Sequence, residues 1–128
     1  MLPDSTAIVV EFLADRMDVP VSSLVPRGRN SLESPARLIT VTRTGGPALN
    51  RAVDKPMLLL HAWGTSSVDA SQLAQEARQV LLDTIARDHP LVRKVEEVVG
   101  LYYSPDPDSE QDRFGFSISL TVRASRAL

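Results

Sequence analysis

The fold of this 128-residue chain is decided by the segment Pro56-Met57-Leu58-Leu59-Leu60-His61-Ala62-Trp63-Gly64. The apolar run between the proline and the glycine is too short for a helix of ordinary length, but it suits a strand. A nearly continuous apolar run is typical of a central strand that is covered on both faces. The sequence therefore predicts such a strand near residues 56–63, with the other elements packed around it.

The hydrophobic period changes after Gly64. Between residues 68 and 87, mostly apolar residues recur at steps of about three and four, which places them on one face of a helix. These residues are Leu73, Ala77, Val80, Leu81, Thr84 and Ile85. Ser66 followed by Asp69 resembles a capping box with a shorter acid. We predict a long amphipathic helix that ends near Asp88-His89-Pro90 and covers one face of the strand.

The remaining elements are predicted from caps, prolines and alternation. A first helix begins at Asp4 or Ser5 and ends at Asp18-Val19-Pro20. Strands are expected at 37–44, at 94–103 within the alternating stretch Val92–Tyr103, and at 113–123. Gly100 marks a candidate bulge. The last strand is predicted to be half-exposed, with one apolar face formed by Phe114, Phe116, Ile118, Leu120 and Val122.

The order of elements is thus helix, strand, strand, helix, strand, strand. Such an order favours an α+β fold, here a single domain over residues 1–128. We expect a mainly antiparallel four-stranded sheet with two helices packed on one side. Segments 27–34, 45–55 and 104–110 are rich in polar and turn-forming residues and are predicted to be exposed loops.

Composition excludes several classes of function. The net charge is −2 with both signs interspersed, so no basic footprint indicates specific nucleic-acid binding. The absence of cysteine removes disulfides and cysteine-ligated zinc. No apolar run approaches the roughly 20 residues of a membrane helix. The start, Met1-Leu2-Pro3-Asp4, lacks the basic-then-apolar pattern of a secretory signal, which predicts synthesis in the cytoplasm.

Candidate catalytic groups are few. A general base at His61, working with Asp54, is one interpretation; the other is a structural histidine, neutral and hydrogen-bonded, within the apolar strand. We favour the structural interpretation because no nucleophile lies beside His61 in the sequence. His89 falls at a helix C-terminus, where the helix dipole favours a cation. We expect no catalytic residue and no cofactor, and predict that the protein is not an enzyme.

The acidic segment with Asp106, Asp108, Glu110 and Asp112 partly imitates a calcium loop. It lacks the glycine and the distal bidentate glutamate of such a loop. We therefore predict an exposed acidic hairpin loop and no metal site.

Several arginines, Arg27, Arg29, Arg43 and Arg51, fall in or beside the predicted loops. They are either separate solvated side chains or the basic rim of an interface, because arginine is enriched at contact surfaces.

One resemblance covers roughly residues 5–124. It rests on the order of the elements and on short motifs, namely Leu38–Gly46, Asp54-Lys55-Pro56, His61-Ala62-Trp63-Gly64, Gly100-Leu101-Tyr102-Tyr103, Pro105-Asp106-Pro107 and Arg113–Arg123. In these features the chain resembles the tail terminator proteins of bacteriophages with long non-contractile tails, especially phages of actinobacteria.

The resemblance implies a structural virion protein without catalytic residues, cofactor or metal. Such a protein forms a six-fold homo-oligomeric ring on the last ring of the tail tube and stops tube polymerisation. Its implied partners are the major tail tube protein and the head-side stopper protein, with no membrane and no specific nucleic acid, although DNA passes through the ring. Its implied location is the head–tail interface of the virion, after assembly in the host cytoplasm.

The family offers no motif that transfers interface residues one by one. From loop chemistry alone we predict that the inter-subunit or tail-tube interface contains Arg27, Arg29, Arg43, Asn50, Arg51, Asp54, Asp106 and Asp108. Three alternatives stay open. They are a head-completion or stopper protein of the same connector, a monomeric α+β adaptor that binds a peptide at a sheet edge, and a small enzyme that uses His61 with Asp54.

Overall fold

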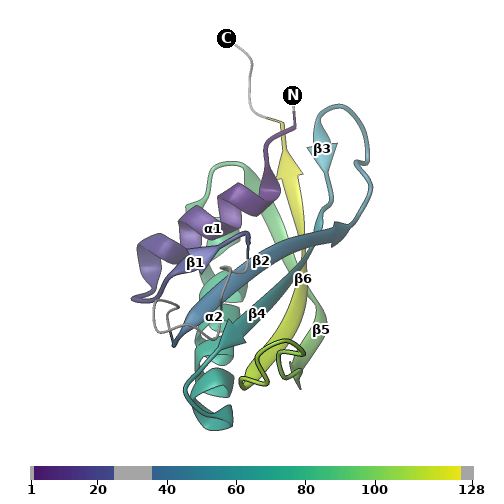
Figure 1. The fold of residues 1–128 in the computed structure, drawn as a ribbon. Coiled ribbons are helices and arrows are strands. Elements are labelled where there is room, and N and C mark those ends of the chain that lie inside the picture. The colour runs from purple at the N-terminus through teal and green to yellow at the C-terminus, as the bar shows by residue number, and fades with distance from the viewer. Residues whose placement is uncertain (1, 25–35, 125–128) are drawn as a thin grey trace.

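The structure, a computed structural model, describes residues 2–24 and 36–124. Two helices and a mixed, curled sheet make up this part of the chain (Figure 1). In chain order the elements are α1 (Ser5–Arg16), β1 (Val21–Ser22), β2 (Leu38–Gly45), β3 (Val53–Asp54), β4 (Met57–Trp63), α2 (Ser67–Asp88), β5 (Val92–Tyr103) and β6 (Arg113–Arg123).

The predicted α+β class is confirmed, but the predicted sheet is only partly right. Strands β2, β4, β6 and β5 are consecutive antiparallel neighbours, as expected. The sheet is nevertheless mixed, because β1 pairs with β2 in parallel, with Val21 opposite Ile39. β1 lies at an edge directly after Pro20, where a missing backbone N–H costs the sheet least.

Strand β3 corrects the prediction that residues 45–55 form a loop. β3 and β4 share one register against β6, with Asp54 opposite Val122 and Met57 opposite Ser119. Between them the Pro56 carbonyl accepts a hydrogen bond of 3.1 Å from the Leu120 amide. The two strands therefore form one line along β6, and the break falls at Pro56, which has no N–H to donate.

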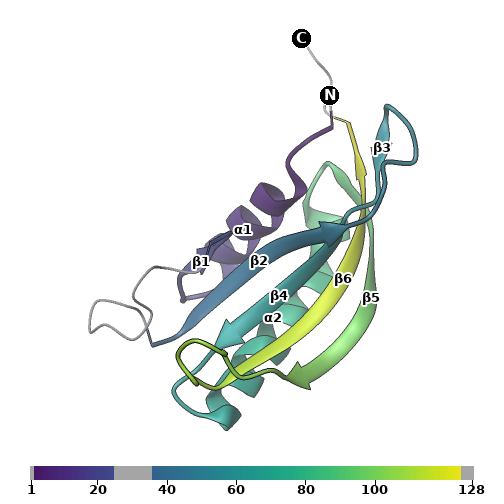
Figure 2. The same ribbon diagram turned by 45° about the vertical axis from the view of Figure 1, so that its right-hand side comes forward.

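Both helices lie on one face of the sheet. α2 packs against β4, β5 and β6, whereas α1 packs against β1, β2 and α2. Figure 2 shows β6 and β5 bowing around α2. The predicted apolar stripe of α2 is confirmed in the buried core. It packs there against alternate residues of β4 and β6. The core includes Leu73, Ala77, Leu81 and Ile85 from the helix, and Leu58, Leu60, Phe116, Ile118 and Leu120 from the two strands.

The helix starts follow the predicted capping chemistry. The Asp4 carboxylate accepts a 3.1 Å bond from the Ala7 amide, and the Ser66 hydroxyl accepts one of 3.1 Å from the Asp69 amide. Asp69 in turn accepts a bond of 2.9 Å from the Thr65 amide. Side-chain oxygens thus satisfy amides of the first turns that have no partner within the helix.

The predicted half-exposure of the last strand is wrong. β6 lies between β4 and β5, and its serines on the face away from the helices, Ser117 and Ser119, are only 8% and 9% exposed. Larger neighbours on both sides shield these small side chains. The candidate bulge at Gly100 is confirmed, because the β5–β6 register shifts between Val99 and Tyr102.

The helix stripe can be tested by truncating its central residue. Leu81 is fully buried, so Leu81→Ala should lower the free energy of unfolding by about 2–5 kcal/mol through the cavity it leaves. Val68 lies on the same helix and is 65% exposed; Val68→Ala should change stability by about 0.5 kcal/mol or less. Chemical denaturation of both variants checks this, and equal effects would contradict the assigned core face.

Candidate functional site

Residues 46–52, which join β2 to β3, form a hairpin that extends beyond the end of the sheet (Figure 1). We call this segment the hairpin arm. Its base is an ion pair between Arg43 and Asp54, joined by two parallel hydrogen bonds of 2.7 and 2.9 Å. The Arg43 guanidinium also donates to the carbonyls of Gly45 (3.1 Å) and Gly46 (2.6 Å). The hydrogen bond to Asp54 raises the pKa of Arg43 further above its ordinary value. This forked, charge-assisted pairing fixes the direction in which the arm leaves the sheet.

The turn of the arm is built by Asn50. Its side-chain oxygen accepts hydrogen bonds from the amides of Ala52 (2.7 Å) and Val53 (2.9 Å), which is the geometry of an Asx turn. The Leu49 amide donates to the Val53 carbonyl at 2.9 Å and closes the arm. Leu49, 60% exposed, and the exposed Arg51 are left at the tip. The arm therefore presents one apolar and one cationic side chain on an ordered turn.

Some of the predicted interface residues build the hairpin arm, and another lies exposed at its tip. Arg43, Asn50 and Asp54 build the arm, so the interpretation of Arg43 as a solvated arginine is wrong. Arg51 is exposed at the tip, as expected. Arg27 and Arg29 lie outside the described residues.

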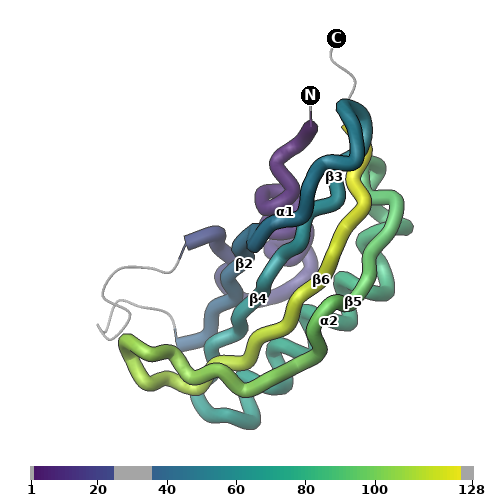
Figure 3. Tube along the Cα trace, turned by 90° about the vertical axis from the view of Figure 1, so that its right-hand side faces the viewer, coloured from purple at the N-terminus to yellow at the C-terminus, as the bar shows by residue number. Residues whose placement is uncertain are grey.

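At the opposite end of the sheet lies the loop 104–112 between β5 and β6 (Figure 3). This loop contacts the buried Trp63 through Asp106. The Trp63 indole N–H donates to the Asp106 carboxylate at 2.9 Å, and the Arg113 guanidinium lies 5.2 Å from the ring centre. Asp106 is only 5% exposed, so the prediction of a fully exposed acidic loop is wrong at this residue. The other Asp106 oxygen accepts the amide of Asp108, whose side chain is exposed.

The pKa of Asp106 reflects two opposing effects. Burial raises it, whereas hydrogen bonds from the Asp108 amide, from Trp63 and from Ser109 lower it, and the net pKa lies below the usual range. The carboxylate is therefore ionised at neutral pH and remains an acceptor for the indole.

His61 lies beside this cluster, on the face of the sheet away from the helices. It is opposite Gly115 in the β4–β6 pair, and its ring centre lies 5.9 Å from that of Trp63. Burial, and then the charge of Arg113, lower the pKa of His61 to about 4, while Asp106 acts in the opposite direction. The imidazole is neutral at pH 7, as the sequence predicts.

The candidate pair of His61 with Asp54 does not form. Asp54 is opposite Val122, a core residue on the helix side, whereas His61 is opposite Gly115 on the other side. The two residues are also separated along one line of strand by roughly 20 Å or more, at about 3.3 Å per residue. The predicted alternative of an enzyme using this pair therefore has no geometric basis.

His89 differs from its prediction. Its Nδ1 accepts a 3.1 Å hydrogen bond from the Leu91 amide, and burial lowers its pKa. A nitrogen that accepts a hydrogen bond carries no proton. His89 therefore shapes the turn after α2 as a neutral ring, not as a cation on the helix dipole.

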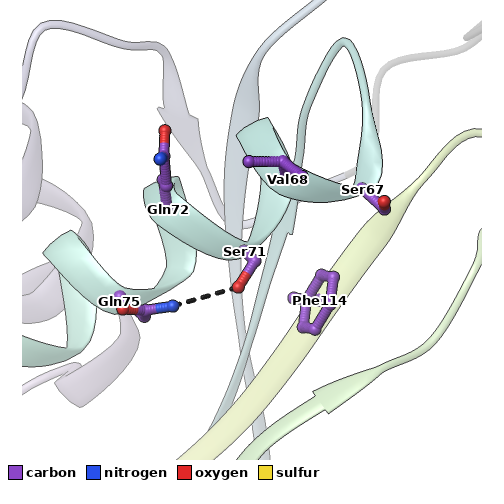
Figure 4. A pocket seen from close by; sticks show the side chains of 6 residues that line it. All are labelled: Ser67, Val68, Ser71, Gln72, Gln75 and Phe114. Carbon is purple, nitrogen blue, oxygen red and sulfur yellow. Dashed lines mark hydrogen bonds between the residues drawn. The ribbon is translucent and has the colours of Figure 1, made fainter.

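A shallow pocket lies between the first turns of α2 and β6 (Figure 4). Hydroxyl, amide and apolar groups line it, and the Gln75 amide donates to the Ser71 hydroxyl at 3.0 Å. The lining consists of Ser67, Val68, Ser71, Gln72, Gln75 and Phe114. None of these residues ionises near neutral pH, so the pocket offers hydrogen bonds but no general acid or base.

No group of three or more histidine, aspartate or glutamate side chains among residues 2–24 and 36–124 is arranged to hold a metal ion. Within the same ranges, no helix has the length and apolar character needed to cross a membrane. No protein-family model matches the chain, and no curated protein matches it.

Removing the guanidinium at the base of the arm should destabilise the protein. The Asp54 side chain is only 3% exposed, so Arg43→Ala leaves a buried carboxylate without its charged partner. We expect a loss of about 1.5–3 kcal/mol in the free energy of unfolding. Arg51→Ala, at the exposed tip, is the matched control and should cost about 0.5 kcal/mol or less. Urea denaturation distinguishes them, and an unchanged midpoint for Arg43→Ala would disprove the anchoring role.

The environment of His61 predicts a specific pH dependence. Its folded pKa of about 4 lies below the ordinary 6.5, so the unfolded chain takes up the proton first as pH falls. His61 therefore lowers the free energy of unfolding as the pH falls from 6.5 to 4. His61→Gln should lose less stability than the parent across this window. NMR titration of the His61 ring gives a direct reading that is independent of His89, and a pKa near 6.5 would refute the assignment.

Proposed function

We propose that this protein is a tail terminator of a bacteriophage with a long non-contractile tail. It forms a six-fold ring on the head-proximal end of the tail tube, stops tube polymerisation and provides the joint to the head-side stopper protein. It acts as a structural virion component, assembled in the host cytoplasm, with no catalytic chemistry and no cofactor.

The observation that carries the proposal is the hairpin arm. A projecting hairpin is a suitable contact element for a neighbouring subunit or a tube end when its base is rigid. Here the Arg43–Asp54 pair fixes the base, Asn50 fixes the turn, and the tip presents Leu49 and Arg51. An exposed arginine beside an exposed aliphatic residue is a combination that interfaces use.

The order of elements gives separate support. One motif on which the resemblance rests, Pro105-Asp106-Pro107, lies in the loop 104–112; the others fall on β2, on the β3–β4 line, on the end of β5 and on β6. These are the elements that form the continuous antiparallel part of the sheet. The resemblance therefore concerns the framework of the fold, not scattered surface residues.

A peptide-binding adaptor is the competing proposal, favoured by the long outer edge of β5. Among the described strands β5 pairs only with β6, and Val98, Val99 and Tyr103 are about half exposed. Its register against β6 shifts at several points, however, and such irregularities disrupt the regular edge that an added strand needs. We therefore favour the ring-forming protein.

The proposal is tested at the arm tip. Arg51→Glu and Leu49→Ser should leave stability within about 0.5 kcal/mol of the parent, because both positions are exposed. Each should weaken ring assembly and tube capping, because the tip then presents a repelling charge or loses its apolar contact. Native mass spectrometry measures the ring, and electron microscopy of complemented phage measures tail length.

The matched control is Gln79→Glu, which adds a negative charge on the exposed side of α2, away from the arm. It should leave rings and tails unchanged. Overlong tails in the tip variants support a terminator, whereas tails of normal length that fail to join heads indicate a stopper protein. Normal tails joined to heads in both tip variants would reject the arm as the contact element.

A further inference from the structure

One face of the sheet carries neither of the described helices, and we call it the open sheet face. Its centre is largely apolar. Across β4, β6 and β5 the register aligns rows of side chains on this face. One row is His61, Gly115 and Tyr102; the next is Leu59, Ser117 and Val99; the third is Met57, Ser119 and Glu96. Small residues therefore occupy the middle strand, with larger side chains on both flanks, of which Met57, Leu59, Val99 and Tyr102 are largely apolar.

This apolar centre is only partly shielded by the chain itself. Met57, Leu59 and His61 are half-buried, and Val99 and Tyr102 are 46% and 37% exposed. The sequence predicts that β4 is covered on both faces, but in the described part of the chain only its helix face is covered along its length. Contiguous apolar surface of this kind on a folded protein marks an interaction site.

The two ends of the open sheet face carry opposite charge. At one end are the exposed Lys55 and Lys94, beside Arg123, which donates to the Pro90 carbonyl at 3.0 Å. Glu96 lies 4.0 Å from Lys55 and 3.5 Å from Lys94. Lys94 is opposite Thr121, in the alternation that also places Ser119 on this face. Basic side chains thus outnumber acidic ones at this end.

The other end lies beneath the loop 104–112, which is predominantly acidic. Asp108 and Glu110 are exposed there, and Asp112 accepts a 2.7 Å hydrogen bond from the Tyr103 hydroxyl. Among the described residues the cation at this end is Arg113, which donates to the Ser104 carbonyl at 2.7 Å and lies over Trp63. The open sheet face is therefore apolar in the middle, basic at one end and acidic at the other.

We infer that the open sheet face packs against the same face of a second copy, about a two-fold axis that runs across the strands. Such an axis reverses the strand direction, so the basic end of each copy meets the acidic end of the other. An axis along the strands would instead place like charges together. The contact is self-complementary, as an isologous interface must be, and it superimposes the two apolar centres.

This contact goes beyond the proposed ring, because it uses the sheet face and not the hairpin arm. The distribution of charge on the open sheet face favours a second copy of the chain as its binding partner. A face whose own two ends are complementary matches itself, whereas a partner of uniform charge would meet repulsion at one end.

Two charge-reversal variants test the inference. Lys55→Glu with Lys94→Glu makes both ends acidic; Asp108→Lys with Glu110→Lys makes both ends basic. At low salt the parent should sediment as a dimer or, where rings form, as two rings joined through this face, and each variant alone should bind itself at least about tenfold more weakly. An equimolar mixture of the two variants should restore a heterodimer, because each end then meets its opposite.

Gln72→Glu with Gln79→Glu, on the exposed side of α2, is the matched control and should leave the dimer intact. Val99→Lys should weaken the dimer by placing a charge in the apolar centre, and circular dichroism checks that it is folded. A monomeric parent, or a mixture that stays monomeric, would overturn the inference. Arg51→Glu should keep the dimer while losing rings, so failure of this contact and failure of the proposed function give different results.

Discussion

The antiparallel pairing of β4 with β6 is the contact on which the other elements depend. It runs without a register shift from Met57 opposite Ser119 to Trp63 opposite Arg113, and β3 extends it past Pro56. Because the pairing is regular, alternate side chains of both strands fall on the same face. One face gathers large apolar residues from both strands and receives α2. The other receives small residues from β6, and from β4 three half-buried side chains and the buried Trp63; neither described helix packs there.

Two irregular segments leave this framework, and each is anchored by one carboxylate withdrawn from solvent. The arm is held on the helix side by Asp54, and the loop 104–112 on the other side by Asp106. Asp54 is paired with a guanidinium, whereas Asp106 accepts an indole N–H and backbone amides. Both solutions satisfy the requirement that a buried charge be hydrogen-bonded. These hydrogen-bonded carboxylates therefore order the irregular segments at the two ends of the sheet.

The sequence predicts the regular elements well because their signals are local. The helix stripe of α2 and the alternation of β6 depend on neighbours within a few residues, and their bounds are close to those predicted. The anchoring pairs depend on contacts across 11 and 43 residues, which no local pattern reveals. The sequence therefore places Arg43 either in solvent or at an interface and Asp106 in an exposed loop, whereas both side chains anchor segments of the fold. The exposure of β6 was wrong for the same reason, since alternation does not report which strands lie on either side.

The position of Pro56 explains why the arm and the open sheet face are distinct surfaces. Met57, which follows it, belongs to the open sheet face, whereas Asp54, before it, lies on the helix side and holds the arm. A proline between them fixes the local backbone and removes one donor from the ladder. The arm can therefore contact a neighbour without displacing β4, and a partner on the open sheet face can pack without moving the arm. Two contacts mounted on separate sides of one rigid strand line allow a small chain to meet more than one neighbour in an assembly.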